Sequence, residues 1–287
     1  MNYELKNFSE SYLEQQFEIG NLNCSTWLGG QQTPVDRLRE IYGQNDFDPQ
    51  TKFYALHNNE VVGFITARQS DQANANLEFP LFRPGHDEVV EPLMDFAFKT
   101  LREKGVSKLI TRASPRWGST MEYAKRYSYT LKELMWKNAR LVVDDYIQPE
   151  SAVDVADVEE SDYEEIQSIL MSFRKNSEQE AQRQVELLNR IAERVTSWKI
   201  VREDGRISGH DHLVQDIRIS NKARMNAIFA ESDEIRNGIM NAHVKAASEN
   251  NIEFIDSFFF GPTENMDGPY NQYGFEISDL YAYEKDL

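Results

Sequence analysis

The run from Pro80 to Glu88 combines the residue types of an anion-binding loop. An apolar strand ends at Phe82, and Arg83, a proline and Gly85 lead into a long amphipathic helix. Backbone N–H groups at such a helix start point at one spot and carry the positive end of the helix dipole, so this loop could hold a phosphate or pyrophosphate. Arg83 would add a charge-assisted contact, and Gly85 permits backbone geometry that other residues resist.

Acidic residues in the same loop oppose that interpretation. Asp87 and Glu88 fall in the first helical turn, where they satisfy the helix dipole themselves. They would also repel a phosphate placed nearby. A capped helix start without a ligand therefore stays open as the alternative.

Other side chains that could do chemistry form weaker patterns. His210-Asp211-His212 places two imidazoles on one face of a strand, but no third metal ligand is evident, and alternation in a half-buried strand explains the pair better. Cys24 has no partner motif for nucleophilic catalysis. As the one cysteine, it excludes an internal disulfide framework and a multi-cysteine zinc site. We therefore expect no metal.

Composition and charge exclude several classes of protein. The 287 residues are 40% hydrophobic and 28% charged, an ordinary globular mixture, and their formal net charge is −17. This acidity argues against a nucleic-acid binder and disfavours binding to an anionic membrane surface. No apolar run approaches the ~20 residues that span a bilayer. The polar start, Met1–Lys6, lacks a secretory signal, so we expect a cytoplasmic protein.

The charge is unevenly distributed along the chain. Residues 1–145 hold 17 Lys and Arg against 20 Asp and Glu, a net of −3, and residues 146–287 hold 14 against 28, a net of −14. Within the first half, Lys99–Arg140 contains 11 basic and three acidic residues. An anionic cofactor would therefore be held better by the first half, whereas the second would repel an anion or attract a cation.

Helix and strand patterns divide the chain into two similar halves. A proline-containing segment at Asp144–Ser151 separates residues 1–145 from residues 150–287, and no flexible linker is present. Each half shows a strand, two helices, a hairpin, a strand, a long helix, a strand, a short helix and final strands. Elements of the first half include the strand Leu77–Phe82, the helix Asp87–Lys104 and a terminal hairpin of 131–136 with 138–143.

Three landmarks repeat at one offset and indicate a duplication. Gly63 matches Gly209, Gly105-Val106 matches Asn251-Ile252, and Ser128-Tyr129 matches Gly274-Phe275, each 146 residues later. This period is far too long for a solenoid. The sequence therefore predicts a duplicated domain of about 140 residues.

The order of elements and three motifs resemble the GNAT superfamily of N-acetyltransferases. Val61-Val62-Gly63-Phe64 after the Asn58-Asn59 turn resembles the hairpin of the family's second and third strands. Pro80-Leu81-Phe82-Arg83-Pro84-Gly85-His86 resembles the fourth strand as it enters the pyrophosphate loop, and Tyr270-Asn271-Gln272-Tyr273-Gly274-Phe275 resembles the signature before the sixth strand. The resemblance covers nearly the whole chain. It implies an α/β fold of two tandem GNAT-like domains, each a mixed, mostly antiparallel sheet flanked by helices.

The resemblance also implies direct transfer of an acetyl group from acetyl-CoA to a small-molecule or peptide amine. A backbone N–H of the fourth strand, at Leu81 or Phe82, would polarise the thioester carbonyl. Glu78 on that strand is the candidate base, and Tyr123 and Tyr270 are the candidates for the acid that protonates the leaving thiolate. Exposed strand glutamates and packed tyrosines are also common, so structural roles for all three stay open.

Contacts to acetyl-CoA are implied for the fourth strand and the loop that follows it. In the family, the region of Trp27, Gly29 and Gly30 shapes the acceptor pocket, and a flexible connection stays open as the alternative here. The residues implied to bind acetyl-CoA are Leu81, Phe82, Arg83, Gly85, His86, Asp87 and Glu88.

The second copy lacks the features of a donor site. By the 146-residue offset, Phe229–Glu234 takes the place of Arg83–Glu88, and it has no Arg, no Gly and three carboxylates. We therefore expect acetyl-CoA in the first half only. The second half would be structural or would shape the acceptor site, and its acidity favours a cationic amine by electrostatic steering.

An alternative from another class remains. In the first half, His86 and Glu88 fall where members of the family carry small residues, and Tyr123 is one residue out of register with Tyr270. A non-catalytic GNAT-like protein that binds a small molecule or partner would show the same features. A third interpretation keeps the fold with an aminoacyl-tRNA as donor, which the net charge opposes.

Overall fold

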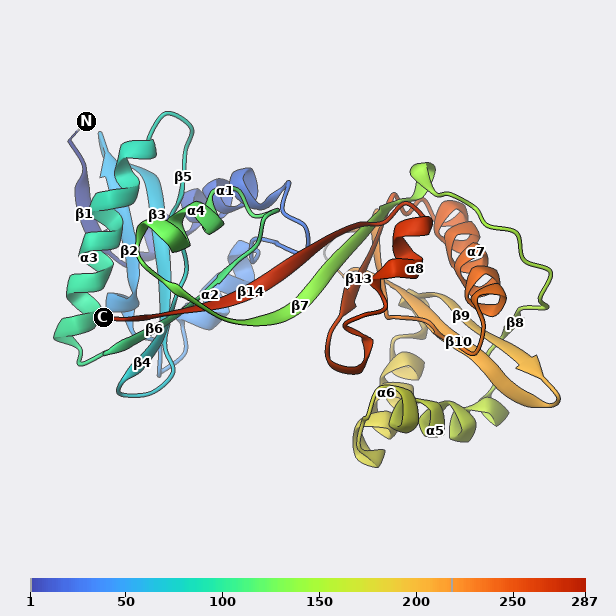
Figure 1. Ribbon diagram of the computed structural model, residues 1–287. Coiled ribbons are helices and arrows are strands. Elements are labelled where there is room, and N and C mark those ends of the chain that lie inside the picture. The colour runs from blue at the N-terminus through green and yellow to red at the C-terminus, as the bar shows by residue number, and fades with distance from the viewer. Residues whose placement is uncertain (1, 218) are drawn as a thin grey trace. The chain divides into compact units, whose positions relative to one another are not determined.

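The computed structural model describes residues 2–217 and 219–287, which form two compact units (Figure 1). The first unit combines the chain up to Met135 with Asp279–Leu287, and the second unit is Trp136–Ser278. Each unit is a sheet covered by helices. The predicted α/β fold of two similar domains with mixed, mostly antiparallel sheets is confirmed.

The sheet of the first unit has the strand order β1-β2-β3-β4-β6-β14-β7, and β5 pairs with β3. β4 and β6 run parallel, whereas the β1–β2, β2–β3, β3–β4 and β6–β14 pairs are antiparallel. The strands are β1 (Glu4–Asn7), β2 (Lys52–His57), β3 (Glu60–Gln69), β4 (Asn74–Leu77), β5 (Leu81–Phe82), β6 (Lys108–Ala113), β7 (Thr130–Val142) and β14 (Glu276–Asp286).

Helices cover both faces of this sheet because its central strands are apolar on both sides. In β2, Phe53 and Ala55 join the core under α3, and Tyr54 and Leu56 join the core under α1, as strand alternation requires. α3 contacts β1, β2 and β3, and α1 contacts β3, β5 and α2. The helices are α1 (Leu13–Cys24), α2 (Val35–Tyr42), α3 (Val90–Glu103) and α4 (Thr120–Arg126).

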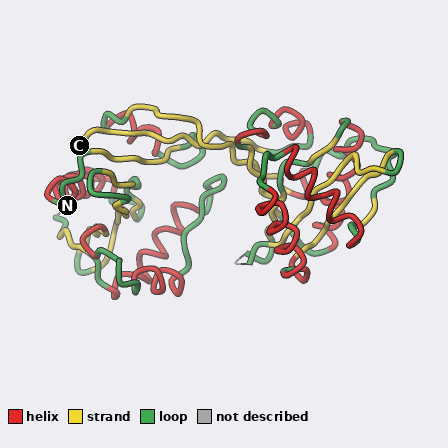
Figure 2. Tube along the Cα trace, turned by 90° about the horizontal axis from the view of Figure 1, so that it is seen from below, coloured by secondary structure: helices red, strands yellow, loops and turns green. Residues whose placement is uncertain are grey.

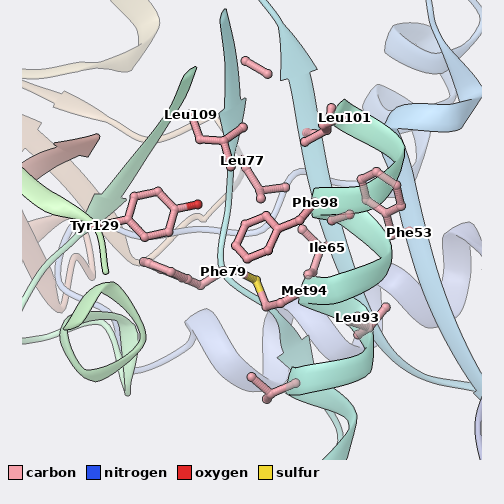
Figure 3. Packing of buried hydrophobic residues seen from close by; sticks show 14 of the residues in the cluster. Phe53, Ile65, Leu77, Phe79, Leu93, Met94, Phe98, Leu101, Leu109 and Tyr129 are labelled. Carbon is pink, nitrogen blue, oxygen red and sulfur yellow. The ribbon is translucent and has the colours of Figure 1, made fainter. Parts of the chain in front are cut away.

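α3 forms where the sequence predicts it. Its buried residues recur at the spacing of one helix face, and Figure 3 shows Leu93, Met94 and Phe98 packed toward the strands. The predicted helix Asp87–Lys104 is confirmed from Val90 onward, and Asp87–Val89 forms a short 3-10 turn, η3. Gly105 follows the helix with a φ of +85°, a conformation that ends helices.

The predicted hairpin at the end of the first half is wrong. Thr130–Val142 is one continuous strand, β7, which pairs with β13 of the second unit through Lys137↔Phe259 to Val142↔Phe254. Asn138, expected just beyond the turn, is 1% exposed within that sheet. β14 in turn supplies the first unit, where Tyr281–Asp286 pairs with β6.

This exchange of strands also moves the boundary between the units. The sequence predicted two continuous domains, 1–145 and 150–287, separated at Asp144–Ser151. The compact units instead change at Met135 and again after Ser278. The physical reason is that a strand can pair with any edge that reaches it, so its alternation shows that it is a strand but not which sheet it joins.

The second unit repeats the plan of the first. Its strand order is β7-β13-β11-β10-β9-β8, and β12 pairs with β10. α7 contacts β9, β10 and β12, while α5 packs on α6 and β10, and Figure 2 shows helices flanking the strands in each unit. Its elements are β8 (Ala156–Asp157), α5 (Tyr163–Phe173), α6 (Glu178–Arg190), β9 (Val195–Glu203), β10 (Arg206–Gln215), β11 (Lys222–Met225), β12 (Phe229–Ala230), α7 (Asp233–Glu249), β13 (Phe254–Phe259) and α8 (Asp267–Gln272).

Backbone conformation supports the duplication. Gly105 and Asn251 have φ values of +85° and +55°, and Ser128 and Gly274 have φ values of +57° and +91°. Each pair ends a helix in the same way, at positions 146 residues apart. The landmarks therefore mark equivalent points of two copies of one fold.

The core of the second unit contains a buried polar cluster. Asp211 is 0% exposed, and its carboxylate lies 3.7 Å from Arg174 Nη2, 3.7 Å from His243 Nε2 and 3.9 Å from His212 Nδ1. The adjacent His210 Nε2 accepts a hydrogen bond from the Trp198 indole at 2.8 Å, which requires a neutral imidazole.

Burial keeps both strand histidines neutral. It lowers the pKa of His210 to about 3 and that of His212 to about 4, because the charged imidazolium would lose its hydration. The two rings are therefore core residues, and each uses its Nε2 in a hydrogen bond: His210 with Trp198, and His212 with Asn226 Nδ2 at 3.1 Å.

The continuity of the second unit predicts that it folds alone. We expect the fragment 136–278 to unfold cooperatively, because it is one uninterrupted segment. The fragment 1–135 lacks β14, which lies between β6 and β7, and we expect no cooperative transition from it. Joining 279–287 to Met135 through a short Gly/Ser linker should restore the transition in calorimetry. A cooperative 1–135 fragment would contradict the exchange.

The buried histidines predict that acid destabilises the second unit. The unfolded chain titrates both near the ordinary histidine pKa of about 6.5, so below that pH it binds more protons than the folded chain. The neutral histidines therefore cost no stability above this pH. As the pH drops toward 4, the free energy of unfolding falls by up to about 1.4 kcal/mol per pH unit for each histidine. Urea unfolding of the fragment 136–278 between pH 7.5 and 5 measures this slope.

His210→Gln supplies the matched control, because the amide oxygen still accepts from Trp198 but does not titrate. We expect roughly half the dependence on pH in this variant. An unchanged slope would show that His210 is not one of the titrating groups.

Candidate functional site

The strand predicted at Leu77–Phe82 is interrupted after β4. β4 and β5 both pair with β3, but their registers differ by one residue, so 78–80 contains a β-bulge. Pro80 lies in this segment and cannot donate a ladder hydrogen bond. β4 also pairs with β6, whereas β5 pairs only with β3 among the described residues. The sheet therefore opens between β5 and β6.

The N–H of Phe82 points into this opening. The Arg83 N–H donates to the oxygen of Val62 in β3 at 2.8 Å. In an antiparallel strand the N–H groups of successive residues point to opposite edges. The Leu81 N–H therefore points toward β3, like that of Arg83, and the Phe82 N–H points away from β3. The Asn23 side chain donates to the oxygen of Phe82 at 3.0 Å and holds this side of β5. Of the two predicted N–H donors, Phe82 is the one aimed at the opening.

The loop after β5 keeps backbone N–H groups available. Gly85 has a φ of +82°, which favours glycine, and the His86 N–H donates to the oxygen of Arg83 at 3.2 Å. Within the described part of the chain, the N–H groups of Gly85 and Asp87 have no acceptor. The loop leads directly into η3 and α3. This combination of free N–H groups and a helix start fits a phosphate.

Arg83 has a partner in the first unit. Its guanidinium donates to the carboxylate of Glu18 at 2.8 Å and to the oxygen of Val61 at 3.2 Å. The Arg83 side chain is 34% exposed and that of Glu18 is 61% exposed. Exposed ion pairs of this kind are weak, so an anion in the loop would compete with Glu18 for the guanidinium.

His86, Asp87 and Glu88 lie at the surface of the loop. His86 Nδ1 is 3.3 Å from the hydroxyl of Tyr3. Asp87 and Glu88 are exposed in η3. The two carboxylates remain the feature of this loop that opposes a bound phosphate.

A cavity of about 290 Å³ lies beside the break in the strand, and Glu78 and Leu81 line it. The Glu78 carboxylate accepts a hydrogen bond from Arg112 at 2.6 Å. The guanidinium of Arg112 lies 5.9 Å from the centre of the Trp117 ring. The candidate base therefore lies in the wall of a cavity next to the strand that carries Phe82.

Two stacked tryptophans form another wall of this cavity. The rings of Trp27 and Trp117 are 5.0 Å apart and nearly parallel, and the Trp117 indole donates to the oxygen of Leu28 at 2.8 Å. Gly30 packs so tightly that a Cβ there would lie 2.7 Å from the Cβ of Trp27. Thus the segment that the family resemblance assigned to the acceptor pocket lines the cavity of Glu78.

A second cavity of about 400 Å³ shares Thr66, Glu78 and Arg112 with the first. Lys52 and Arg68 also line it. Lys52 is 8% exposed and donates to a backbone oxygen of β3 at 2.7 Å, and burial lowers its pKa to about 8. These basic side chains were not predicted as site residues, because in the sequence both occupy ordinary strand positions.

The two candidate tyrosines have different surroundings. Tyr123 on α4 is half-buried, packs on Phe79 of the bulge at 5.8 Å between ring centres, and has its pKa raised by burial. Tyr270 is 0% exposed, and its hydroxyl accepts the N–H of Ile228 at 2.6 Å. Tyr123 thus lies next to the break, whereas Tyr270 serves the core of the second unit.

The predicted alignment of the two loops needs a correction. The Glu231 N–H donates to the oxygen of Ser208 at 2.9 Å, as the Arg83 N–H does to that of Val62. The counterpart of Arg83 is therefore Glu231 rather than Phe229, and the offset in this strand is 148 residues rather than 146. The two-residue shift arises because β10 and β11 are joined by a longer loop than β3 and β4.

The second unit has almost no loop at this point. Glu231 and Ser232 alone separate β12 from α7, and the hydroxyl of Ser232 caps the helix. Glu231 accepts a hydrogen bond from Arg206 at 2.6 Å. The helix start is thus satisfied by its own cap, and a carboxylate stands where Arg83 stands in the first unit.

Over residues 2–217 and 219–287, no three His, Cys, Asp or Glu side chains gather as a metal ion would need. The helices described there all lack the length and hydropathy for crossing a bilayer.

No family model matches the sequence, and no curated protein matches it either. Solved structures match along the whole chain. An acetyltransferase of the GNAT family from Colwellia psychrerythraea has a TM-score of 0.62 at 11% identity, over 98% of this chain and 99% of that one. A GCN5-related N-acetyltransferase from Sphaerobacter thermophilus has a TM-score of 0.61 at 8% identity, over 99% and 95%.

A tandem GNAT protein from the clavulanic acid biosynthesis pathway is also similar, with a TM-score of 0.58 at 11% identity over 99% of this chain and 98% of that one. At such identities the similarity is one of fold. This chain therefore has the fold of tandem GNAT proteins, as its motifs and their repetition predicted.

Proposed function

We propose that the chain is an N-acetyltransferase whose first unit moves an acetyl group from acetyl-CoA to an amine. The observation that carries this proposal is the break between β4 and β5, which aims the Phe82 N–H at an opening beside the cavity of Glu78. The shared fold supports the same reaction, since similar structures are named as N-acetyltransferases.

The loop after β5 would hold the pyrophosphate of the donor. The free N–H groups of Gly85 and Asp87 and the start of the helix attract an anion, and Arg83 would exchange Glu18 for a phosphate oxygen. The carboxylates of Asp87 and Glu88 weaken this site. Because Glu231 and the capped α7 replace the loop in the second unit, we propose one donor site per chain.

In the proposed reaction, the amine nitrogen attacks the thioester carbonyl carbon. The C–N bond forms and the C–S bond breaks. The Phe82 N–H would stabilise the negative charge that develops on the carbonyl oxygen. Glu78 would take the proton of the ammonium, directly or through water. The Tyr123 phenol is protonated at neutral pH, as tyrosine ordinarily is, and burial raises its pKa further. It would give a proton to the departing thiolate.

The charges around Glu78 limit the acceptor. Arg112, Lys52 and Arg68 line the two adjoining cavities, and Glu78 is the one carboxylate among the described residues that line them. The acidity of the second half predicted a cationic amine, but the local charges oppose further positive charge on the acceptor. We therefore propose a small-molecule or peptide amine that carries no second cationic group.

The donor proposal predicts the stoichiometry of binding. Calorimetric titration of the intact protein with acetyl-CoA should give one site per chain. Two sites would show that the second unit also binds the donor. No binding at millimolar acetyl-CoA would favour the alternative, a non-catalytic GNAT-like protein that binds another small molecule or a partner.

The proposed phosphate contact of Arg83 predicts that its substitution weakens the binding of CoA. Arg83→Glu replaces a cation by an anion at the loop, so we expect the Kd for CoA to rise at least tenfold. Glu18→Gln is the matched control, because it frees Arg83 without changing the loop, and CoA should bind it as tightly as the natural chain or more tightly. An unchanged Kd in Arg83→Glu would remove the phosphate role of this loop.

The proposed role of Glu78 as the base predicts that its substitution slows turnover. Glu78→Gln keeps the shape of the cavity but cannot accept the proton, so we expect kcat to fall about 100-fold or more, with the Kd for acetyl-CoA unchanged. The exposed Glu60 of the same unit provides the control, and Glu60→Gln should keep full activity. Full turnover by Glu78→Gln on an accepted amine would reject the assignment of Glu78 as the base.

A further inference from the structure

The second unit holds a cavity of about 260 Å³ at the position that corresponds to the Glu78 cavity of the first unit. The strand registers make Asn226 the counterpart of Glu78 and Phe258 the counterpart of Arg112. Asn226 and Phe258 line this cavity as Glu78 and Arg112 line the other. The position is thus duplicated, but no carboxylate is among the described residues that line the copy.

A largely buried cation, Arg174, lines this second cavity. The side chain of Arg174 is 17% exposed. Its Nη2 donates to the oxygen of Ala227 at 3.1 Å. Over the described residues, no acceptor meets the other N–H groups of this guanidinium. These donors are available to a ligand in the cavity, and an anion there would satisfy them with charge-assisted hydrogen bonds.

Asp211 does not accept a hydrogen bond from Arg174. It lies 3.7 Å from Arg174, beyond hydrogen-bond distance, and it is fully buried. Its carboxylate is also shared with His243 Nε2 at 3.7 Å and His212 Nδ1 at 3.9 Å. The guanidinium, whose planar fork suits a carboxylate held by two parallel hydrogen bonds, therefore keeps N–H donors without an acceptor in the lining of the cavity.

The rest of the lining is of two kinds. Asn176, Gln184 and Asn226 contribute side-chain amides, and Phe258 and Phe260 contribute aromatic rings. Phe260 is 58% exposed, so much of its ring is free to contact a ligand. One cation with a few amides and an apolar wall is typical of a site that orients a small, partly apolar molecule.

We propose that the cavity of the second unit binds a small monocarboxylate with an aromatic or aliphatic body. Arg174 pairs with the carboxylate, and Phe258 and Phe260 contact the body. A phosphate ester fits less well, because Asp211 behind the guanidinium repels a second negative charge. This site is separate from the acyl transfer proposed for the first unit.

The test uses a matched pair of probes on the intact protein. Isothermal titration with 3-phenylpropionate should give one site per chain, and the neutral 3-phenylpropanamide should bind at least tenfold more weakly. Equal affinities for the two probes would overturn the proposal. So would the absence of binding by the carboxylate at millimolar concentration.

Three variants test whether Arg174, Asn226 and Phe260 contact the carboxylate ligand. Arg174→Lys keeps a charge beside Asp211 but loses the fork, so the carboxylate should bind at least tenfold more weakly. Asn226→Asp places a carboxylate in the lining and should abolish binding. Phe260→Ala changes an exposed side chain, so the fold should be kept while affinity falls severalfold. Unchanged affinity in Arg174→Lys and Phe260→Ala would overturn the proposal.

A variant of the first unit shows which of the two cavities binds 3-phenylpropionate. Arg112→Met should leave the affinity for 3-phenylpropionate unchanged, because Arg112 lines the other cavity. Loss of binding in Arg112→Met, with retention in Arg174→Lys, would assign the probe to the first unit and overturn the proposal. Titration of Arg174→Lys with acetyl-CoA reports on the first unit alone, so the two proposals fail independently.

Discussion

A one-residue bulge between β4 and β5 sets the geometry on which the site of the first unit depends. β5 stays on β3, but its register is shifted, and its pairing toward β6 is lost. In a regular continuation of β4 the Phe82 N–H would donate to β3, as the Glu78 N–H donates to the oxygen of Thr66, and the bulge instead turns it away from β3. Pro80 makes the regular strand unfavourable, and Asn23 of α1 holds the displaced one through the oxygen of Phe82. One local sequence feature and one distant side chain thus maintain the opening.

The two units use one frame for different local chemistry. In both, the helical segment that follows this loop packs closely on a glycine of the sheet, since a Cβ on Gly63 would lie 3.0 Å from Val89 of η3 and one on Gly209 would lie 2.2 Å from Ile235 of α7. The copies diverge just before that helix, where the first has a loop with free N–H groups and the second has the cap at Ser232. The frame depends on buried contacts. The exposed segment between strand and helix can therefore change without loss of the fold.

Sequence patterns predicted the parts of this structure that depend on nearby residues. The helical spacing of apolar side chains located α3, and the positions around Gly105 and Asn251 marked equivalent helix ends. The exchange of β7 and β14 escaped prediction because alternation is the same whichever sheet a strand joins. The pair of Glu78 with Arg112, 34 residues apart, likewise depends on which strands are neighbours.

Net charge says less about ligands here than the position of single charges. Residues 146–287 carry a net charge of −14, yet the cavity of the second unit is lined by Arg174 and by no carboxylate among the described residues. The first half is nearly neutral, yet basic side chains surround Glu78. Exposed charges are screened beyond about 8–10 Å, whereas a buried charge acts at short range with little screening. The few charges that line a cavity therefore decide what it binds, and the acidic surface chiefly affects solubility and the rate of encounter.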